Sequence, residues 1–127
     1  MKKEFIPYEQ ALALKELGFD EPCIAFYEPN NEKVMIVGVP QKYNDPSLLY
    51  VTDFCAPLYQ QAFEFFRKKY GLEGEPQRAE DFIWYKWTIH QYNENGKKYV
   101  ADWYEYKTYE EAELACLKKL IEIVQTH

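Results

Sequence analysis

Apolar residues recur at helical spacing in two early segments, and the same punctuation marks both. The first segment covers residues 7–17, where Pro7 suits the first turn and Gly18 can adopt the left-handed position after the last turn. The second covers residues 57–70, again with a proline at its start and with Gly71 beyond its end. The pattern therefore predicts two helices that end in glycine caps.

A third helix is predicted over residues 108–126, and its start is the clearest of the three. Thr108 and Glu111 form a T-x-x-E capping box, in which the threonine side chain accepts a hydrogen bond from the first turn. The apolar stripe that follows is made of Leu114, Cys116, Leu117, Leu120, Ile121, Ile123 and Val124. Its width indicates burial against a sheet or contact with another chain.

A short motif opens all three helical segments. It reads Tyr8-Glu9-Gln10-Ala11, then Tyr59-Gln60-Gln61-Ala62, then Tyr109-Glu110-Glu111-Ala112. Either this is the ordinary composition of a helix start, or the chain uses a helix–strand–strand unit twice. The second interpretation predicts repeat units at 5–55 and 56–107, closed by the helix at 108–126.

The segments between the helices contain strand-like sequence. Residues 23–27 and 33–39 read as two strands joined by a turn that contains proline and asparagine. Residues 40–55 are the least legible part, with one short strand expected at 48–52. Residues 73–81 read as a polar linker.

A β-hairpin is the strongest local prediction. Residues 82–92 and 97–106 are rich in aromatic and β-branched side chains, and Asn95-Gly96 between them favours a two-residue turn. That turn sets a register in which Trp87 lies opposite Tyr104. Aromatic pairs and opposite charges then meet across the strands, which supports the register.

This register separates the two faces of the hairpin. The predicted core face carries Ile83, Tyr85, Trp87, Ile89, Val100, Tyr104 and Tyr106. The other face carries Trp84, Lys86, Thr88, His90, Tyr92, Tyr99, Trp103 and Glu105. Trp and Tyr are enriched in the energetic centres of protein interfaces, because they bury a large area at low entropic cost. We therefore predict a binding surface that contains Trp84, Lys86, His90, Tyr92, Tyr99 and Trp103. Two alternatives stay open: the face is covered as a second core layer, or its rings stack a ligand or single-stranded bases.

Composition and charge narrow the function classes. The chain has 127 residues, enough for one domain, and its hydrophobic content of 47% is that of a folded protein. Aromatic residues are unusually abundant, at 18%. With 15 basic and 21 acidic residues the net charge is −6, which disfavours nucleic-acid binding. No stretch is apolar enough for a membrane span, and no secretory signal is predicted.

No catalytic residue, metal ligand set or cofactor is predicted. His90 is one of two histidines, and the register places no nucleophile beside it. Cys55 precedes the second helix, whose dipole could lower its pKa, but burial beside Phe54 is the preferred interpretation. The three cysteines, Cys23, Cys55 and Cys116, form no CxxC pair, which argues against a disulfide framework or a zinc site. A reducing compartment fits, and the predicted localisation is cytoplasmic.

Three stretches carry a resemblance. They are residues 5–19 (Phe5-Ile6-Pro7-Tyr8-Glu9 at the start), residues 56–63, and residues 109–120. Together they resemble a family of small uncharacterised proteins found in gut anaerobes and in their phages and mobile elements. The resemblance covers about a third of the chain. It implies a cytoplasmic protein that is accessory to a mobile element, and it carries no activity and no functional residue.

These patterns predict one α+β domain over residues 1–127. We expect a mainly antiparallel sheet of four or five strands packed against two or three helices, in the order αββαββα. The predicted function is a non-enzymatic protein-interaction or regulatory module that docks a protein partner or a second copy, as a homodimer, through the aromatic hairpin face. The alternatives are single-stranded nucleic-acid binding through the same face, or an enzyme with an unrecognised site. No small-molecule ligand and no membrane contact are predicted.

Overall fold

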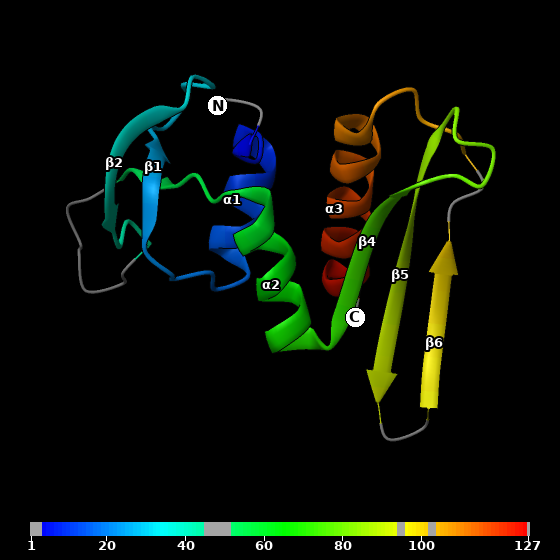
Figure 1. Ribbon diagram of the computed structural model, residues 1–127. Coiled ribbons are helices and arrows are strands. Elements are labelled where there is room, and N and C mark those ends of the chain that lie inside the picture. The colour runs from blue at the N-terminus through cyan, green and yellow to red at the C-terminus, as the bar shows by residue number, and fades with distance from the viewer. Residues whose placement is uncertain (1–3, 45–51, 94–95, 102–103, 127) are drawn as a thin grey trace. The chain divides into compact units, whose positions relative to one another are not determined.

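The computed structural model describes residues 4–44, 52–93, 96–101 and 104–126 (Figure 1). The elements in chain order are α1 (Tyr8–Glu16), β1 (Cys23–Tyr27), β2 (Met35–Gln41), β3 (Phe54–Cys55), α2 (Tyr59–Tyr70), β4 (Leu72–Arg78), β5 (Tyr85–Asn93), β6 (Gly96–Ala101) and α3 (Tyr109–Gln125). The α+β class is confirmed. The chain divides into two compact units, an N-terminal unit of residues 1–62 and a C-terminal unit of residues 63–127.

The end of α1 forms as its sequence predicts. Gly18 has φ +94°, and its N–H donates to the carbonyl of Lys15 at 3.1 Å. The Phe19 N–H donates to the Leu14 carbonyl at 2.9 Å, and both of these side chains are buried. This is a Schellman ending, in which two carbonyls of the last turn find donors just beyond the helix. The left-handed backbone at this position favours glycine.

The sheet of the N-terminal unit has the strand order β2-β1-β3, and all of its pairs are antiparallel. β1 matches its predicted bounds and alternates buried and partly buried positions. β2 is an edge strand that is exposed at every position, and the register shift opposite Ile24 leaves Val37, Gly38, Val39 and Pro40 bulged out of the ladder. The strand expected at 48–52 falls mostly on residues outside the described ranges.

The sheet of the C-terminal unit has the order β4-β5-β6 and is antiparallel throughout. The prediction of a polar linker at 73–81 was wrong, because β4 pairs with β5 along its full length, from Leu72 opposite Gln91 to Arg78 opposite Tyr85. β4 lies at the edge of the sheet. An edge strand tolerates Pro76 and polar side chains, because only one of its sides is hydrogen-bonded. The sequence of β4 therefore shows no clear alternation of apolar and polar residues.

Helix α3 packs on β4 and β5 and covers one face of this sheet (Figure 1). Thr108 caps α3, since its Oγ1 accepts a hydrogen bond from the Glu111 N–H at 3.1 Å, as the capping box predicts. Gly74 of β4 lies against α3. A Cβ placed there would lie 2.9 Å from the Cys116 Sγ atom and 3.0 Å from Leu120. Glycine at this position therefore lets the helix sit close to the strand.

The hairpin forms, but its register differs from the predicted one by two residues. His90 lies opposite Tyr99 rather than Ala101, and Asn93 pairs with Gly96. The connecting residues 94–95 lie outside the described ranges. Moving a two-residue loop by one position shifts the cross-strand pairs by two, and side chains then keep their faces because the pleat has a period of two.

The predicted core face is confirmed at Trp87 and Ile89, which are buried. It was wrong at Ile83 and Tyr104, which are 68% and 65% exposed. The reason is that β5 begins at Tyr85 and β6 ends at Ala101, so both residues lie beyond the paired strands.

The strands form two three-stranded sheets rather than one sheet of four or five. In the described residues the element order is α, three strands, α, three strands, α, so each unit holds one strand more than the predicted αββ pattern. The two sheets differ in strand order, since the first strand is central in one and the second strand is central in the other. The repeat units at 5–55 and 56–107 stay a prediction.

Candidate docking site

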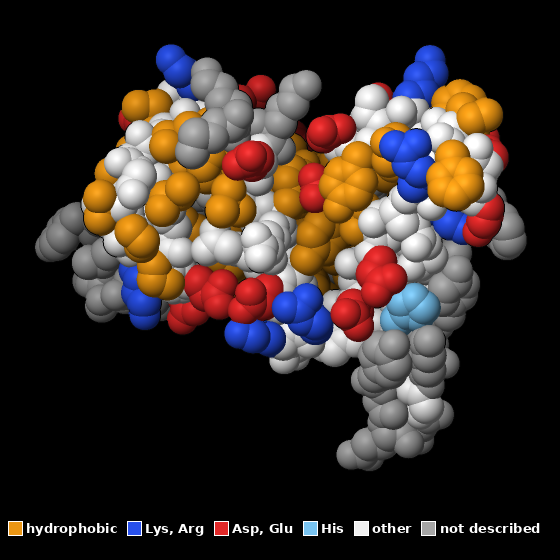
Figure 2. Space-filling model, viewed as in Figure 1, with side chains coloured by type: hydrophobic (Ala, Val, Ile, Leu, Met, Phe, Trp, Pro, Cys, Tyr) orange, Lys and Arg blue, Asp and Glu red, His pale blue; other side chains and the backbone are white. Residues whose placement is uncertain are grey.

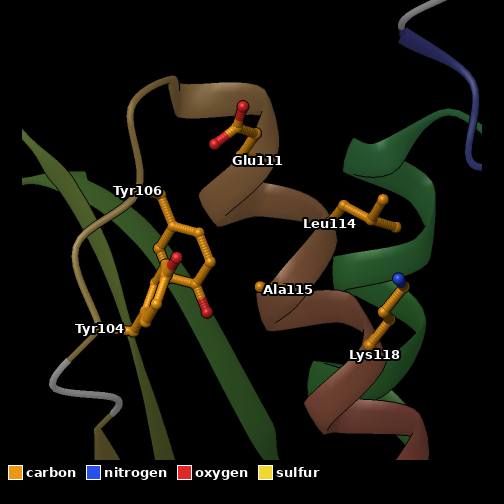
Figure 3. A pocket seen from close by; sticks show the side chains of 6 residues that line it. All are labelled: Tyr104, Tyr106, Glu111, Leu114, Ala115 and Lys118. Atoms are coloured by element: carbon orange, nitrogen blue, oxygen red, sulfur yellow. The ribbon is translucent and has the colours of Figure 1, made fainter.

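A surface pocket lies between the segment that follows β6 and the first half of α3. Its volume is about 320 Å³, and it is lined by Tyr104, Tyr106, Glu111, Leu114, Ala115 and Lys118. Figure 3 shows both tyrosine rings turned toward Ala115, which offers only a methyl group there. The two ring centroids are 4.9 Å apart. The pocket therefore combines an apolar wall with two phenol groups, one carboxylate and one ammonium.

Two anchors hold Tyr106 in place. It exchanges a pair of backbone hydrogen bonds with Tyr85 at the start of β5, at 2.8 and 2.9 Å. Two residues later Thr108 caps α3. Since the chain is fixed to the sheet at Tyr106 and to the helix at Thr108, the backbone on the Tyr106 side of the pocket is set by these hydrogen bonds.

Tyr85 joins the pocket to a second aromatic group. Its ring meets the ring of Tyr109 edge-on, with the centroids 6.1 Å apart. The Arg78 guanidinium lies over the Tyr85 ring, 5.0 Å from the centroid, and its Nη2 donates to the Tyr85 hydroxyl at 2.7 Å. Such cation–π contacts orient an aromatic ring at a partly exposed site.

The loop between β4 and β5 holds an exposed aromatic residue in an unfavourable conformation. Phe82 has φ +61° and is 72% exposed. Arg78 Nη1 donates to the Phe82 carbonyl at 2.8 Å, and the Phe82 N–H donates to Ala79 at 3.0 Å. Asp81 Oδ1 accepts from the next two N–H groups, of Ile83 and Trp84. A bulky residue in the left-handed region is rare and persists only where its surroundings impose it.

We call Phe82, Ile83, Tyr104, Tyr106 and Tyr109 together the tyrosine end of the C-terminal unit. Arg78 links the Phe82 loop to Tyr85, and Tyr85 in turn contacts Tyr106 and Tyr109. Three of these side chains are more than 60% exposed. In Figure 2 hydrophobic side chains gather at the surface of this unit at one end. Large apolar side chains that share one exposed region are typical of a surface that binds a partner.

The acidic start of α3 borders the tyrosine end. Glu110 and Glu111 lie in the first turn and are exposed. Burial, followed by repulsion from Glu110, raises the pKa of Glu113 to about 7. Burial also raises the pKa of Tyr109. At neutral pH this border is negatively charged, apart from the fraction of Glu113 that is protonated, and Lys118 is the cation in the pocket lining.

The residues that the sequence predicted as a binding surface are placed as follows. Trp84 lies in the loop before β5 and is partly buried, and Lys86 binds Glu80 at 2.7 Å. His90 is partly buried on β5. Tyr92 and Tyr99 belong to β5 and β6, with only their backbones described, and Trp103 lies outside the described residues. The same face includes Thr88, which is only 4% exposed, so the face is covered at that point.

The tyrosine end was not predicted from the sequence. Tyr104 and Tyr106 were predicted to lie on the core face, and Phe82 was predicted only as the first residue of the hairpin. The sequence did contain a signal for it. Tyr104 and Tyr106 come just before the capping box of α3, and a strand cannot continue into a helix cap. Residues just before a helix cap belong to a loop, and loops carry binding residues more often than sheet interiors do.

A second apolar surface lies on the N-terminal unit. β2 exposes Met35, Ile36, Val37 and Val39, and it is the edge strand of its sheet. Figure 2 shows hydrophobic side chains at the surface of this unit as well. Native proteins usually protect apolar edge strands, and here the bulge with Gly38 at φ +84° interrupts the edge.

Within the described ranges, no cluster of three His, Cys, Asp or Glu side chains is arranged to hold a metal ion. No helix among the described residues combines the length and the apolar character needed to cross a bilayer. Searches with the whole chain find no matching protein family, no matching curated protein and no matching solved structure. The family resemblance of the helical segments therefore stays a prediction.

Proposed function

We propose that this protein is a non-enzymatic protein-interaction module that docks a partner through the tyrosine end of its C-terminal unit. The observation that carries the proposal is Phe82, an exposed phenylalanine held at φ +61° by hydrogen bonds to Arg78 and Ala79. Backbone strain of this kind costs about 1–3 kcal/mol and is concentrated at functional sites. A ring that served only the fold would be buried rather than held in solvent.

The partner that fits this surface is a protein segment with an apolar anchor next to a lysine or arginine. The anchor would enter the pocket beside Tyr104, Tyr106 and Ala115. The basic residue would face Glu110 and Glu111 at the start of α3, and the whole chain carries a net charge of −6. Such a segment satisfies both the apolar wall and the acidic border, and electrostatic attraction speeds its association.

The cellular context is part of the same proposal. Cys23, Cys55 and Cys116 are all free, which supports a reducing compartment such as the cytoplasm. An accessory role in a mobile element, which the family resemblance implies, is compatible with a module that recruits another protein.

The test is selection from a random peptide library displayed on phage, with the full-length protein as bait. Selected peptides should pair an apolar residue with Lys or Arg. Their affinity should fall about tenfold or more for Phe82→Ala and for Ala115→Phe, which removes one anchor and fills the pocket respectively. Val39→Ser is the matched control, because Val39 is 58% exposed but lies on the other unit.

Three results would overturn the proposal. The first is that no sequence pattern is enriched, and the second is that the selected peptides bind equally well to the unchanged protein and to both variants. The third is that no peptide is selected while a single-stranded oligonucleotide quenches tryptophan fluorescence in a salt-sensitive way, because that result favours nucleic-acid binding. Circular dichroism of each variant checks that its fold is intact.

A further inference from the structure

The carboxylate of Glu111 is a charge that the fold itself does not use. In a capping box the glutamate side chain accepts a hydrogen bond from the N–H of the cap residue. Here the Glu111 N–H donates to Thr108 Oγ1, but among the described residues the Glu111 side chain accepts no hydrogen bond and forms no ion pair. The side chain is also exposed. Its negative charge is therefore available to a partner.

This carboxylate and two tyrosine rings line the same pocket. Figure 3 shows Glu111 on the side of α3 where Tyr104 and Tyr106 lie, whereas the ammonium group of Lys118 points to the other side of the helix. Tyr104 is 65% exposed, so a ligand at the rim of the pocket can reach its side chain. The pocket therefore presents an aromatic ring and an anion together, and its own lysine does not neutralise that anion.

A cation satisfies both of these features. The face of an aromatic ring attracts positive charge, and a carboxylate beside the ring accepts hydrogen bonds from the same cation. Glu110 is exposed in the same helical turn and adds to the negative potential, and the whole chain has a net charge of −6. A negatively charged group would be repelled here. The charge of the site therefore calls for a basic side chain at the rim of the pocket.

The C-terminal unit already contains an arginine that binds a tyrosine in this way. The Arg78 guanidinium lies 5.0 Å from the centroid of the Tyr85 ring. At the same time its Nη2 donates to the Tyr85 hydroxyl at 2.7 Å, and its Nη1 donates to the Phe82 carbonyl at 2.8 Å. A planar guanidinium can thus lie on a ring and still donate two hydrogen bonds. The lysine ammonium is a compact and strongly hydrated charge, so it cannot stack in this manner.

We infer that the basic residue of the docked segment is an arginine, whose guanidinium stacks on Tyr104 and donates two hydrogen bonds to the Glu111 carboxylate. This inference rests on the proposed docking function and specifies the side chain that the acidic border selects. The apolar anchor of the same segment keeps its place against Ala115. Lysine in place of arginine loses both the stacking and the paired hydrogen bonds, so the site discriminates between the two basic residues.

The experiment uses three phage-displayed peptide libraries, with the full-length protein as bait. The libraries are identical except at one fixed central residue, which is arginine, lysine or glutamine. Peptides from the arginine library should be enriched most. The best of them is then synthesised with arginine, lysine or citrulline at the centre, and each binding constant is measured by calorimetry. Lysine should weaken binding about tenfold, and citrulline, which is planar but uncharged, should weaken it at least as much.

Variants of the protein identify the groups that discriminate. Glu111→Gln keeps the size of the side chain and removes its charge, so the ratio of arginine to lysine affinity should fall toward one. Tyr104→Leu removes the ring and should lower the same ratio. Glu110→Gln is the matched comparison, because Glu110 lies in the same turn but does not line the pocket. It should weaken both peptides by the same factor and leave the ratio as it is in the unchanged protein.

The possible outcomes separate this inference from the proposed function. If peptides are selected but bind equally well with arginine and with lysine, the inference is wrong and the docking function stands. The same holds if Glu111→Gln leaves the affinity ratio unchanged, or if the glutamine library is enriched as strongly as the arginine library. If none of the three libraries is enriched, the proposed function fails and this inference fails with it.

Discussion

Replacing Gly74 with alanine tests the packing that seats α3 on its sheet. The new Cβ would lie 2.9 Å from Cys116 Sγ, 3.0 Å from Leu120 Cδ1 and 3.0 Å from Phe63 Cε1. Carbon contacts are optimal at about 3.5–4.0 Å, so the methyl group is too close on three sides. Inserting a methyl into such a core costs about 1–3 kcal/mol. Alanine regains about 0.4–1 kcal/mol by restricting the unfolded chain. The net expectation is a loss of about 1–2 kcal/mol.

Urea denaturation followed by tryptophan fluorescence measures this loss. All of the tryptophans, at positions 84, 87 and 103, belong to the C-terminal unit, so the signal reports the unit that contains Gly74. For a slope of about 1–2 kcal/mol per M the midpoint should fall by about 1 M. The slope itself should not change.

A double-mutant cycle isolates the cause. Cys116→Ala removes the nearest of the three atoms, so Gly74→Ala should cost about 1 kcal/mol less in that background than alone. A midpoint for Gly74→Ala that is equal to or above that of the unchanged protein would refute the packing argument. Equal costs in both backgrounds would show that the Cys116 sulfur is not the obstacle.

Three further predictions follow from single residues. Thr108→Ala removes the hydrogen bond to the Glu111 N–H, and should lower the free energy of unfolding by about 1 kcal/mol, whereas Thr108→Ser should restore it in thermal melts. The pKa of Glu113 is raised to about 7, so the folded protein holds this proton more tightly than the unfolded chain. Its contribution to stability is therefore full at acidic pH and is lost as the pH rises through about 7, and Glu113→Gln should flatten the stability profile between about pH 5 and 8. Phe82→Gly should raise stability by about 1 kcal/mol by relieving φ +61°, yet weaken peptide binding. Loss of stability in that variant would contradict the backbone strain inferred at this position.

Local signals in the sequence predicted the helix ends well. The Schellman ending at Gly18 and the cap at Thr108 both depend on contacts within a few residues. The bounds of β1 were confirmed for a similar reason, since proline residues on either side leave few alternatives. Such interactions do not depend on the path of the rest of the chain, so they can be predicted from the sequence without knowing the fold.

The proposed binding surface was harder to predict, because it depends on where the strands end. The register of the hairpin moved by two residues, and the strands ended at Tyr85 and Ala101. That change placed Ile83 and Tyr104 in solvent instead of the core. A strand ends where its partner strand and the covering helix end. The positions of those ends cannot be predicted from the alternation of apolar and polar residues within the strand itself.

The amino-acid sequence by itself determined the helices with their caps, the α+β class and the burial of Trp87 and Ile89, because these follow from periodicity and from contacts between near neighbours. Only the tertiary structure decided that β4 is a strand, that Cys23 and Cys55 both donate to the Glu21 carbonyl, and that tyrosines from the end of the hairpin form a pocket on α3. Each of these depends on pairing between distant segments. The free energy of such a pair is shared between two parts of the chain, so neither part carries the whole signal.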